Sequence, residues 1–192
     1  AAPGWAKWES ALMGAAGEAT EQMLDAANVK TGMRVLDLAC GAGSQTIQAA
    51  RRVGPTGQVF ANDIASKMLT FVISNTAAEG LTNVETLHGP AEDLSESELR
   101  VDAATCRLGL MLFQSPQDAL AAVRSVLAEN GCFAVLVVAS PQENLLFSKT
   151  MMIALKHAGK TPPPPGSPGL FALSDPARLE DLFQAAGYID TR

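Results

Sequence analysis

An acidic residue and two glycines lie around the end of a short apolar segment. Val35 begins this segment, which contains Asp37, and Gly41 and Gly43 follow it. An amphipathic segment from Ser44 to Arg52 comes next. This order predicts a strand, a tight loop and a helix, the layout from which α/β folds build a ligand site. Because glycine lacks a Cβ atom, the loop can take positive φ angles and a ligand can approach its backbone closely.

A second acidic residue fits the same site. Twenty residues beyond Gly43, the apolar segment from Val59 to Ala61 ends at Asn62 and Asp63. A carboxylate at the end of a second strand is placed to accept hydrogen bonds from a ribose diol. Together, the two features predict a site for a cofactor that contains a nucleoside.

The residues of the loop favour one kind of nucleoside cofactor. A dinucleotide fingerprint has a third glycine where the helix packs on the strand, and Thr46 stands at that position. No glycine loop is followed by Lys-Ser or Lys-Thr, and no Lys or Arg lies between Ala39 and Gln48. An adenosyl ligand without a pyrophosphate therefore fits better than NAD, although an NAD-dependent oxidoreductase remains an alternative.

The loop resembles the first motif of the class I S-adenosylmethionine-dependent methyltransferases. That motif is an acidic residue followed by small residues or glycines at alternate positions, here Asp37, Ala39, Gly41 and Gly43. The resemblance implies S-adenosylmethionine as the cofactor and S-adenosylhomocysteine as the product. Ala39 stands where the family has its first glycine, which leaves slightly less room without blocking the turn.

The resemblance continues along the chain. Residues 62–69 look like the second-strand motif, which implies that Asp63 binds the ribose hydroxyls and that Ile64 lies against adenine. Residues 87–94 and 102–111 look like the third-strand motif and the fourth strand with its exit loop. Within the family, the chain is most similar to the small-molecule branch related to the ubiquinone/menaquinone-biosynthesis C-methyltransferases.

One position departs from the third-strand motif. Pro90 stands where the family commonly has an acidic residue that accepts from the adenine amino group, so this contact must come from Glu92, Asp93 or water. The full set of expected cofactor contacts is Asp37, Ala39, Cys40, Gly41, Ala42, Gly43, Asp63, Ile64, Met68, Ala91, Glu92, Cys106 and Arg107.

Each charged residue in this set also has a structural interpretation. Asp37 could bind backbone amides of the loop, and Asp63 could be a solvated residue at a helix start. Glu92 could be a solvated loop charge. Arg107 could pair with a surface carboxylate, or it could contact the methionine carboxylate of the cofactor.

Strands and helices alternate along the chain, which predicts a Rossmann-like three-layer αβα sandwich with a mainly parallel sheet. We expect helices over 5–28, 66–79 and 144–158, and a central strand over 132–139. Asp37, Asp63, Glu92 and Cys106 all fall at predicted carboxyl ends of strands, where such sheets bind ligands.

A single methyltransferase domain over residues 1–192 is expected, in four parts. These are an N-terminal helical lid segment (1–28), the cofactor-binding core (29–140), a helical lid insertion (141–173), and the last helix with the start of a sixth strand (174–192). The final antiparallel strand that the family usually has is not in the sequence, so a fragment or a shortened form is expected.

The acceptor is expected to be a small, apolar molecule. Candidate acceptor contacts are Trp8, Met111, Phe147, Met151 and Met152. Neither a catalytic dyad nor a triad is evident, so no catalytic residue is named. No metal is expected, because the His and Cys residues lack ligand spacing. A non-catalytic binding or assembly protein with the same fold is a further alternative.

Composition and charge make some classes of partner and location poor candidates. The chain has 192 residues and a formal net charge of −6, without a basic stripe, so nucleic acid is a poor partner. No apolar run approaches the roughly 20 residues that span a bilayer, and no signal peptide is visible. Three separated cysteines are typical of a reduced, cytoplasmic protein. A homodimer is an open possibility.

Overall fold

One parallel sheet forms the centre of the computed structural model, which describes residues 16–164 and 166–191. Its strands within these residues are β1 (Arg34–Leu38), β2 (Gln58–Asp63), β3 (Val84–His88), β4 (Val101–Arg107) and β5 (Leu127–Leu136). They lie in the order β3-β2-β1-β4-β5, and every neighbouring pair is parallel. Every residue of β1 after Arg34 is buried, which suits its central position, because both faces of a parallel sheet are covered.

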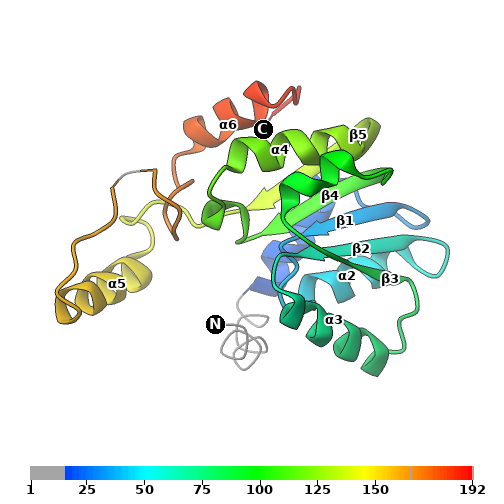
Figure 1. Cartoon of the computed structure of the whole chain (residues 1–192), viewed down its shortest axis with the longest axis horizontal. Coiled ribbons are helices and arrows are strands. Elements are labelled where there is room, and N and C mark those ends of the chain that lie inside the picture. The colour runs from blue at the N-terminus through cyan, green and yellow to red at the C-terminus, as the bar shows by residue number, and fades with distance from the viewer. Residues whose placement is uncertain (1–15, 165, 192) are drawn as a thin grey trace.

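Helices cover both faces of the sheet (Figure 1). α2 (Ser44–Val53) and α3 (Ser66–Ala78) lie on one face, while α4 (Pro116–Val126) and α6 (Pro176–Ala185) lie on the other. Two short 3₁₀ turns, η1 (Ala91–Glu96) and η2 (Leu110–Leu112), follow β3 and β4. The predicted Rossmann-like three-layer sandwich is confirmed.

Local signals in the sequence set several helix ends. The Ser115 side chain accepts a hydrogen bond from the Asp118 amide at the start of α4, where Pro116 occupies the first turn. Gly80 takes a φ of 68° directly after α3, as expected for a residue that ends a helix.

The hydrophobic core has a main part on each side of the sheet. Leu36, Leu38 and Leu120 are fully buried between the sheet and α4, and Phe183 of α6 joins them. On the other side, residues such as Val35 and Val59 pack with α2 and with the N-terminal helix.

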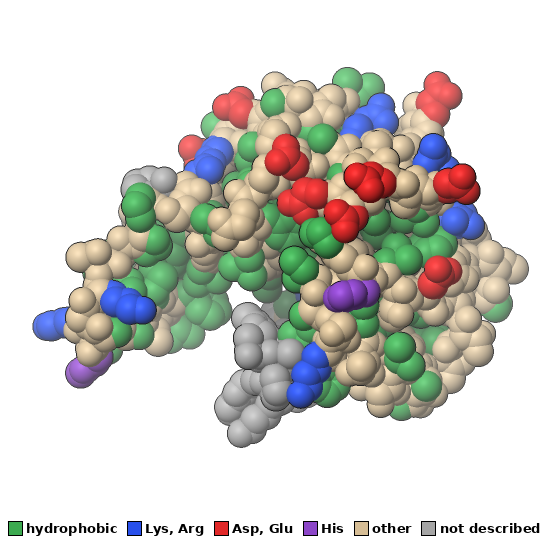
Figure 2. Space-filling view, in the orientation of Figure 1, with side chains coloured by type: hydrophobic (Ala, Val, Ile, Leu, Met, Phe, Trp, Pro, Cys, Tyr) green, Lys and Arg blue, Asp and Glu red, His purple; other side chains and the backbone are tan. Residues whose placement is uncertain are grey.

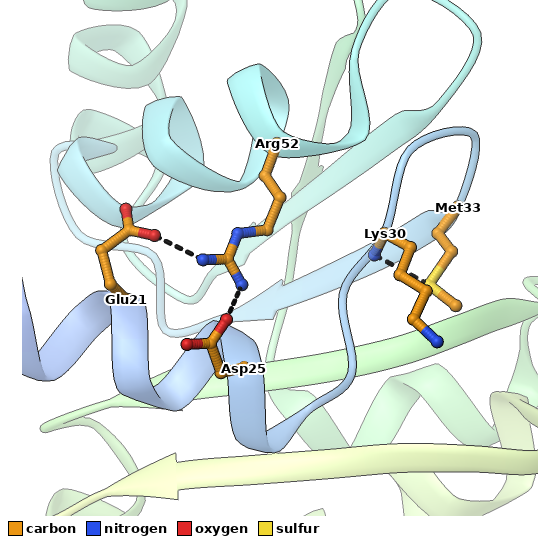
Figure 3. A network of polar contacts seen from close by, with 5 residues as sticks. All are labelled: Glu21, Asp25, Lys30, Met33 and Arg52. Atoms are coloured by element: carbon orange, nitrogen blue, oxygen red, sulfur yellow. Dashed lines mark hydrogen bonds and ion pairs between the residues drawn. The ribbon is translucent and has the colours of Figure 1, made fainter.

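An ion-pair cluster holds the N-terminal helix against α2. Residues 16–26 are helical, and the part of the expected helix before residue 16 lies outside the described residues. Arg52 of α2 binds both Glu21 and Asp25 at 2.5 Å (Figure 3). The two acceptors lie four residues apart, so they share one face of the helix.

β5 begins earlier than expected. It spans Leu127–Leu136 instead of residues 132–139, and its pairing with β4 shifts register between Val101 and Ala103. Asn130 takes a φ of 63° within these bounds. The Asn-Gly turn expected before the strand is therefore an irregularity inside it.

The expected sixth strand does not form in the described residues. Tyr188 packs on Phe133 and Phe183, and its hydroxyl donates to the Leu120 carbonyl at 3.0 Å. Ile189 is exposed and Asp190 takes a φ of 54°, so the backbone turns instead of extending. The contacts of Tyr188 hold this segment on the body without strand pairing in the described residues.

α5 (Leu145–His157) stands away from the sheet at one end of the molecule (Figure 1). Residues of the following connector return to the body, where Leu173 is buried in the core. The inserted segment thus leaves the core only in its first part. None of the helices in the described residues is long and apolar enough to cross a lipid bilayer.

Candidate functional site

The carboxyl ends of β1 and β4 lie side by side at the centre of the sheet. The chain runs from β1 outward to β2 and β3, then crosses back to β4 on the other side of β1. Strand order reverses at this point, and open α/β sheets bind ligands in the crevice that results. The loop after β1 therefore opens on the place where a ligand site is expected.

Three residues of this loop take left-handed conformations. Ala39, Gly41 and Gly43 have φ angles of 53°, 58° and 97°. A Cβ atom on Gly43 would lie 3.2 Å from Val72 of α3, whereas a Cβ on Gly41 would meet no atom within 4 Å. Gly43 therefore allows the loop to pack on α3, and Gly41 faces open space that a ligand can enter.

Ala39 is accommodated by a glycine from another part of the chain. A Cβ atom on Gly109 would lie only 2.6 Å from the Ala39 Cβ and 2.9 Å from the Cys106 Sγ. The expected loss of room at Ala39 is thus real, and the missing side chain of Gly109 relieves it. Ala39 still carries the strain of an alanine in the left-handed region.

Asp37 is a fully buried carboxyl beneath the loop. It accepts hydrogen bonds from Gln45 Nε2 and from Thr46 Oγ1, both at the start of α2. Burial raises the pKa of Asp37 to about 7, although the hydrogen bonds from Thr46 and Gln45 and the charge of Arg107 lower it. Asp37 therefore joins β1 to α2 through side chains, and not through backbone amides as its structural interpretation supposed.

Asp63 joins the ends of two strands. Its Oδ2 accepts from the Gly41 amide at 3.0 Å, and its Oδ1 accepts from the Ala65 amide at 2.8 Å. Each carboxylate oxygen has two lone pairs, so both can accept a further hydrogen bond. The structure thus holds the buried Asp63 carboxylate beside the half-buried backbone of Gly41, and a ribose contact stays a prediction.

Two asparagines that the sequence did not single out hold the loops of the site. Asn75 of α3 donates from Nδ2 to the Ala42 carbonyl at 3.0 Å. Asn62 donates from Nδ2 to the carbonyls of Leu87 and Gly89, each at 3.1 Å. The only signal for Asn75 is a polar residue close to the buried face of α3, between Val72 and Thr76.

Arg107 reaches across the site from the end of β4. Its guanidinium donates to Ser44 Oγ at the start of α2 and to Thr20 Oγ1 of the N-terminal helix, the latter at 2.9 Å. Neither partner is a carboxylate. These two contacts are therefore not the surface ion pair of the structural interpretation, and the contact with the methionine carboxylate stays a prediction.

The remaining cofactor candidates lie around the ends of β2 and β3. Ile64 is 71% exposed, while Met68 and Ala91 are buried and Glu92 is half-buried. His88 lies near the same edge, with its Nε2 3.2 Å from the Ile64 carbonyl. An exposed apolar side chain directly after Asp63 suits the expected position of adenine.

Three other candidates are packed inside the protein. Cys40 is buried against β2 and α3, and Cys106 is fully buried in the core on the other side of the sheet. Burial raises the pKa of the Cys106 thiol to about 12, so the thiol stays neutral at physiological pH. Met111 is also buried in the core, and its contact with an acceptor stays a prediction.

The acceptor candidates on α5 do not reach the loop of the site in this structure. Phe147 is 50% exposed, Met151 is half-buried, and Met152 borders a groove between α5 and the proline-rich connector. Trp8 lies outside the described residues. The expected cofactor residues are thus brought to one edge of the sheet, while the expected acceptor residues remain apart from it.

The sheet order, the loop at the switch point and the position of Asp63 define a Rossmann-like α/β protein. Residues 29–161, more than half of the chain, match the methyltransferase domain family. The chain belongs to this family. The match confirms the resemblance to the class I S-adenosylmethionine-dependent methyltransferases.

Individual relatives of the chain are methyltransferases by name. The ubiquinone/menaquinone biosynthesis C-methyltransferase UbiE of Pseudomonas aeruginosa is 34% identical over 124 residues, which are 64% of this chain and 48% of that protein. UbiE of Stutzerimonas stutzeri is 35% identical over 127 residues, 66% of this chain and 49% of that protein. The chain spans about half the length of these curated relatives.

Solved structures share the fold. A SAM-dependent methyltransferase from Aquifex aeolicus has a TM-score of 0.67 at 21% identity, over 90% of this chain and 81% of that chain. A putative O-methyltransferase from Nostoc punctiforme has a TM-score of 0.68 at 21% identity, over 97% of this chain and 55% of that chain. At these identities, the likeness concerns the fold alone.

Proposed function

We propose that this protein transfers the methyl group of S-adenosylmethionine to a small, apolar acceptor. One observation carries the proposal: Asp63 Oδ2 accepts a hydrogen bond from the Gly41 amide. This contact brings an acidic group and a glycine that faces open space together at the switch point. The pair suits a ribose beside a closely approaching cofactor. The methyltransferase family match over residues 29–161 supports the same cofactor.

The other contacts of the site organise the cofactor in this proposal. The loop from Ala39 to Gly43 receives the methionine part, Arg107 binds its carboxylate, and Ile64 lies against adenine. Asp37 does not touch the cofactor through its buried carboxyl, but holds the loop against α2. Asn75 holds the same loop against α3.

Positioning supplies most of the catalysis in this proposal. A sulfonium is intrinsically activated, so the protein chiefly has to align the methyl group with the acceptor atom. Such alignment can lower a barrier by about 7–11 kcal/mol in favourable cases. A base is required only if the acceptor must lose a proton, and we assign that role to no residue.

The acceptor side consists of α5 and the N-terminal segment in this proposal. The apolar side chains of Phe147, Met151 and Met152 suit an apolar acceptor, and the UbiE relatives are named as C-methyltransferases of ubiquinone and menaquinone biosynthesis. α5 stands clear of the sheet, so it would have to move toward the strand ends to cover an acceptor (Figure 1).

An NAD-dependent oxidoreductase is not favoured. Thr46 occupies the position of the third glycine, is fully buried and donates its hydroxyl to Asp37. The residue is thus part of a different local arrangement from the close glycine contact of a dinucleotide site.

Binding of S-adenosylhomocysteine to the Asp63→Ala variant tests the cofactor site. Hydrogen bonds to a charged group contribute about 1.5–3 kcal/mol, so affinity in calorimetric titration should fall by roughly ten- to a hundredfold. Asp102→Ala is the matched control. Asp102 also accepts a backbone amide, that of Arg34 at 2.8 Å, but at the amino end of β4, so this variant should bind normally.

Two results would count against the proposal. Unchanged affinity in folded Asp63→Ala protein would remove the ribose assignment, and binding of NAD in preference to S-adenosylhomocysteine would replace the cofactor. Turnover of a panel of phenols, quinols and amines then tests methyl transfer itself. A protein that binds the cofactor but methylates none of them would favour a non-catalytic role.

A further inference from the structure

The segment around α5 has a charge opposite to that of the rest of the chain. Between Asn144 and Ser174 there is neither an Asp nor a Glu, but Lys149, Lys156 and Lys160 carry positive charge. The formal charge of this segment is therefore +3 in a chain whose total is −6. All 20 acidic residues lie elsewhere, so the molecule is electrically polarised along its length.

α5 is apolar on most of its surface, yet none of its residues is buried. Leu146 is 77% exposed and Ile153 is 60% exposed, and further apolar side chains of the helix are at least half exposed. Figure 2 shows green side chains at the α5 end of the molecule, together with blue and purple ones. A helix this apolar is stable in water only where something covers it.

The lysines lie among the apolar side chains. At about 100° per residue, positions seven apart nearly coincide around a helix, so Lys149 lies above Lys156 and Leu146 above Ile153. The two rows are neighbours on the exposed surface of α5. Long lysine stems can run along apolar neighbours while their ammonium groups stay in water.

A groove of about 420 Å³ separates α5 from the connector that follows it. Apolar side chains line most of it, including Ile153, Leu155 and Pro162. The side chains of Lys156 and Lys160 also border the groove. An apolar trough with two ammonium groups suits a molecule with a hydrocarbon chain and an anionic head.

We propose that α5 and its connector, residues 145–162, dock on the surface of a bilayer that contains anionic phospholipids. The helix, about 20 Å long at 1.5 Å per residue, would lie in the plane of the interface. In the open position that Figure 1 shows, before α5 moves to cover an acceptor, its apolar side chains would enter the acyl boundary and its lysines would face the phosphates. Because the rest of the chain is acidic, the same surface charge would keep the body in water and orient the molecule.

A second copy of the chain fits this surface less well. Two α5 helices face to face would bring four lysines together, two from each helix, which like-charge repulsion opposes. Elsewhere in the described residues, the large exposed apolar side chains stand on separate elements: Ile64, Ile73, Leu112 and Ile189. No gathered apolar patch is thus available among these four to receive α5.

Co-sedimentation of the full chain with lipid vesicles tests the proposal. We expect binding to vesicles of equal parts phosphatidylglycerol and phosphatidylcholine, and much weaker binding to pure phosphatidylcholine. Lys149→Gln, Lys156→Gln and Lys160→Gln should each weaken binding by about fivefold, and added salt should weaken it further. Lys30→Gln, on the acidic body, is the control that should leave vesicle binding unchanged.

Two isoleucine variants measure the contribution of apolar side chains to vesicle binding separately from that of the lysines. Ile153→Ser should weaken vesicle binding about tenfold or more, because an apolar side chain no longer leaves water. Ile73→Ser is its matched control, since Ile73 is 57% exposed on α3 and should not enter the bilayer. Both positions are exposed, so neither variant disturbs the core.

Three results would overturn the proposal. These are equal binding to both kinds of vesicle, equal effects of Ile153→Ser and Ile73→Ser, and no binding to either vesicle. A dimer detected by sedimentation velocity would be a fourth such result. If the chain forms a dimer that Ile153→Ser abolishes, the surface is an interface between copies and not a lipid-binding surface.

Discussion

Asp37 is a carboxyl that the fold keeps away from water. It lies in β1 under the loop of residues 39–43, and its contacts go to Gln45 and Thr46 of α2. A buried carboxyl stabilises the fold best when it is neutral, because removal of a charge from water is costly. This residue therefore couples the stability of the loop region to pH.

The direction of this pH dependence follows from the pKa. Burial raises the folded-state pKa of Asp37 from 3.8 to about 7, so the folded chain retains a proton that the unfolded chain has lost. Between about pH 4 and 7, Asp37 should make the free energy of unfolding fall as pH rises, by up to about 1.4 kcal/mol per pH unit.

Asp37→Asn should remove this contribution, because an amide has no proton to lose in that range. Chemical denaturation at a series of pH values gives the free energy of unfolding as a function of pH. The contribution of Asp37 is the difference between the slopes of wild type and variant. Asp181→Asn, which changes an exposed carboxylate on α6, controls for the change in net charge. A wild-type slope that Asp37→Asn leaves intact would show that the buried carboxyl is already ionised.

At the scale of elements, an aromatic cluster fixes the last helix on the sheet. The ring of Phe183 on α6 lies 5.6 Å from that of Phe133 on β5 and 5.0 Å from that of Tyr188. Burial raises the pKa of the Tyr188 hydroxyl above its usual range, so it stays protonated and donates to the Leu120 carbonyl. The cluster thus connects α6, β5 and α4 at one edge.

Phe183→Ala should lower the free energy of unfolding by about 3 kcal/mol, since a buried ring leaves a cavity between α6 and the sheet. Phe147→Ala on α5 is the control. Phe147 is 50% exposed and touches no core, so its removal should change stability by less than about 0.5 kcal/mol. Denaturant titration measures the free energy of unfolding of both variants. Similar decreases in the two variants would show that α5 contributes to the core after all.

At the scale of the whole molecule, the chain divides into a packed body and a projecting element. The body carries the sheet and the loop of residues 39–43, while α5 and its connector extend from it (Figure 1). The Gly169 amide donates to the Met111 carbonyl at 2.9 Å, which marks where the connector rejoins the body. We therefore expect a moving α5 to use joints before this point, near Gly159 and Gly166.

Limited trypsin digestion should detect closure of α5 over an acceptor. Lys160 is the only Lys or Arg between Gly159 and Gly169, so one peptide bond reports on this joint. S-adenosylhomocysteine together with a methylated quinol or phenol should slow cleavage after Lys160 more than S-adenosylhomocysteine alone. Cleavage after Lys30 in the body serves as the reference, and equal rates in all ligand states would contradict a closing lid.

Much of the site was accessible from the sequence because its signals are local. Asp37, Gly41 and Gly43 stand within one strand and one turn, and Asp63 follows from a second apolar strand and its spacing. Parallel strands end at a common edge, so alternation of strands and helices alone was enough to bring these residues together. The capped helices and the three-layer class follow from similarly short patterns.

Only the tertiary structure decided which distant residues hold the site in place. Asn75 reaches a carbonyl 33 residues away, and Arg107 reaches a hydroxyl 87 residues away. The bare backbone of Gly109 makes room for Ala39, and Tyr188 joins an aromatic cluster where a strand was expected. These outcomes depend on which surfaces meet after the sheet assembles, and no local pattern carries that information. The exposed position of α5 has the same cause, because its composition shows an apolar helix but not whether the body covers it.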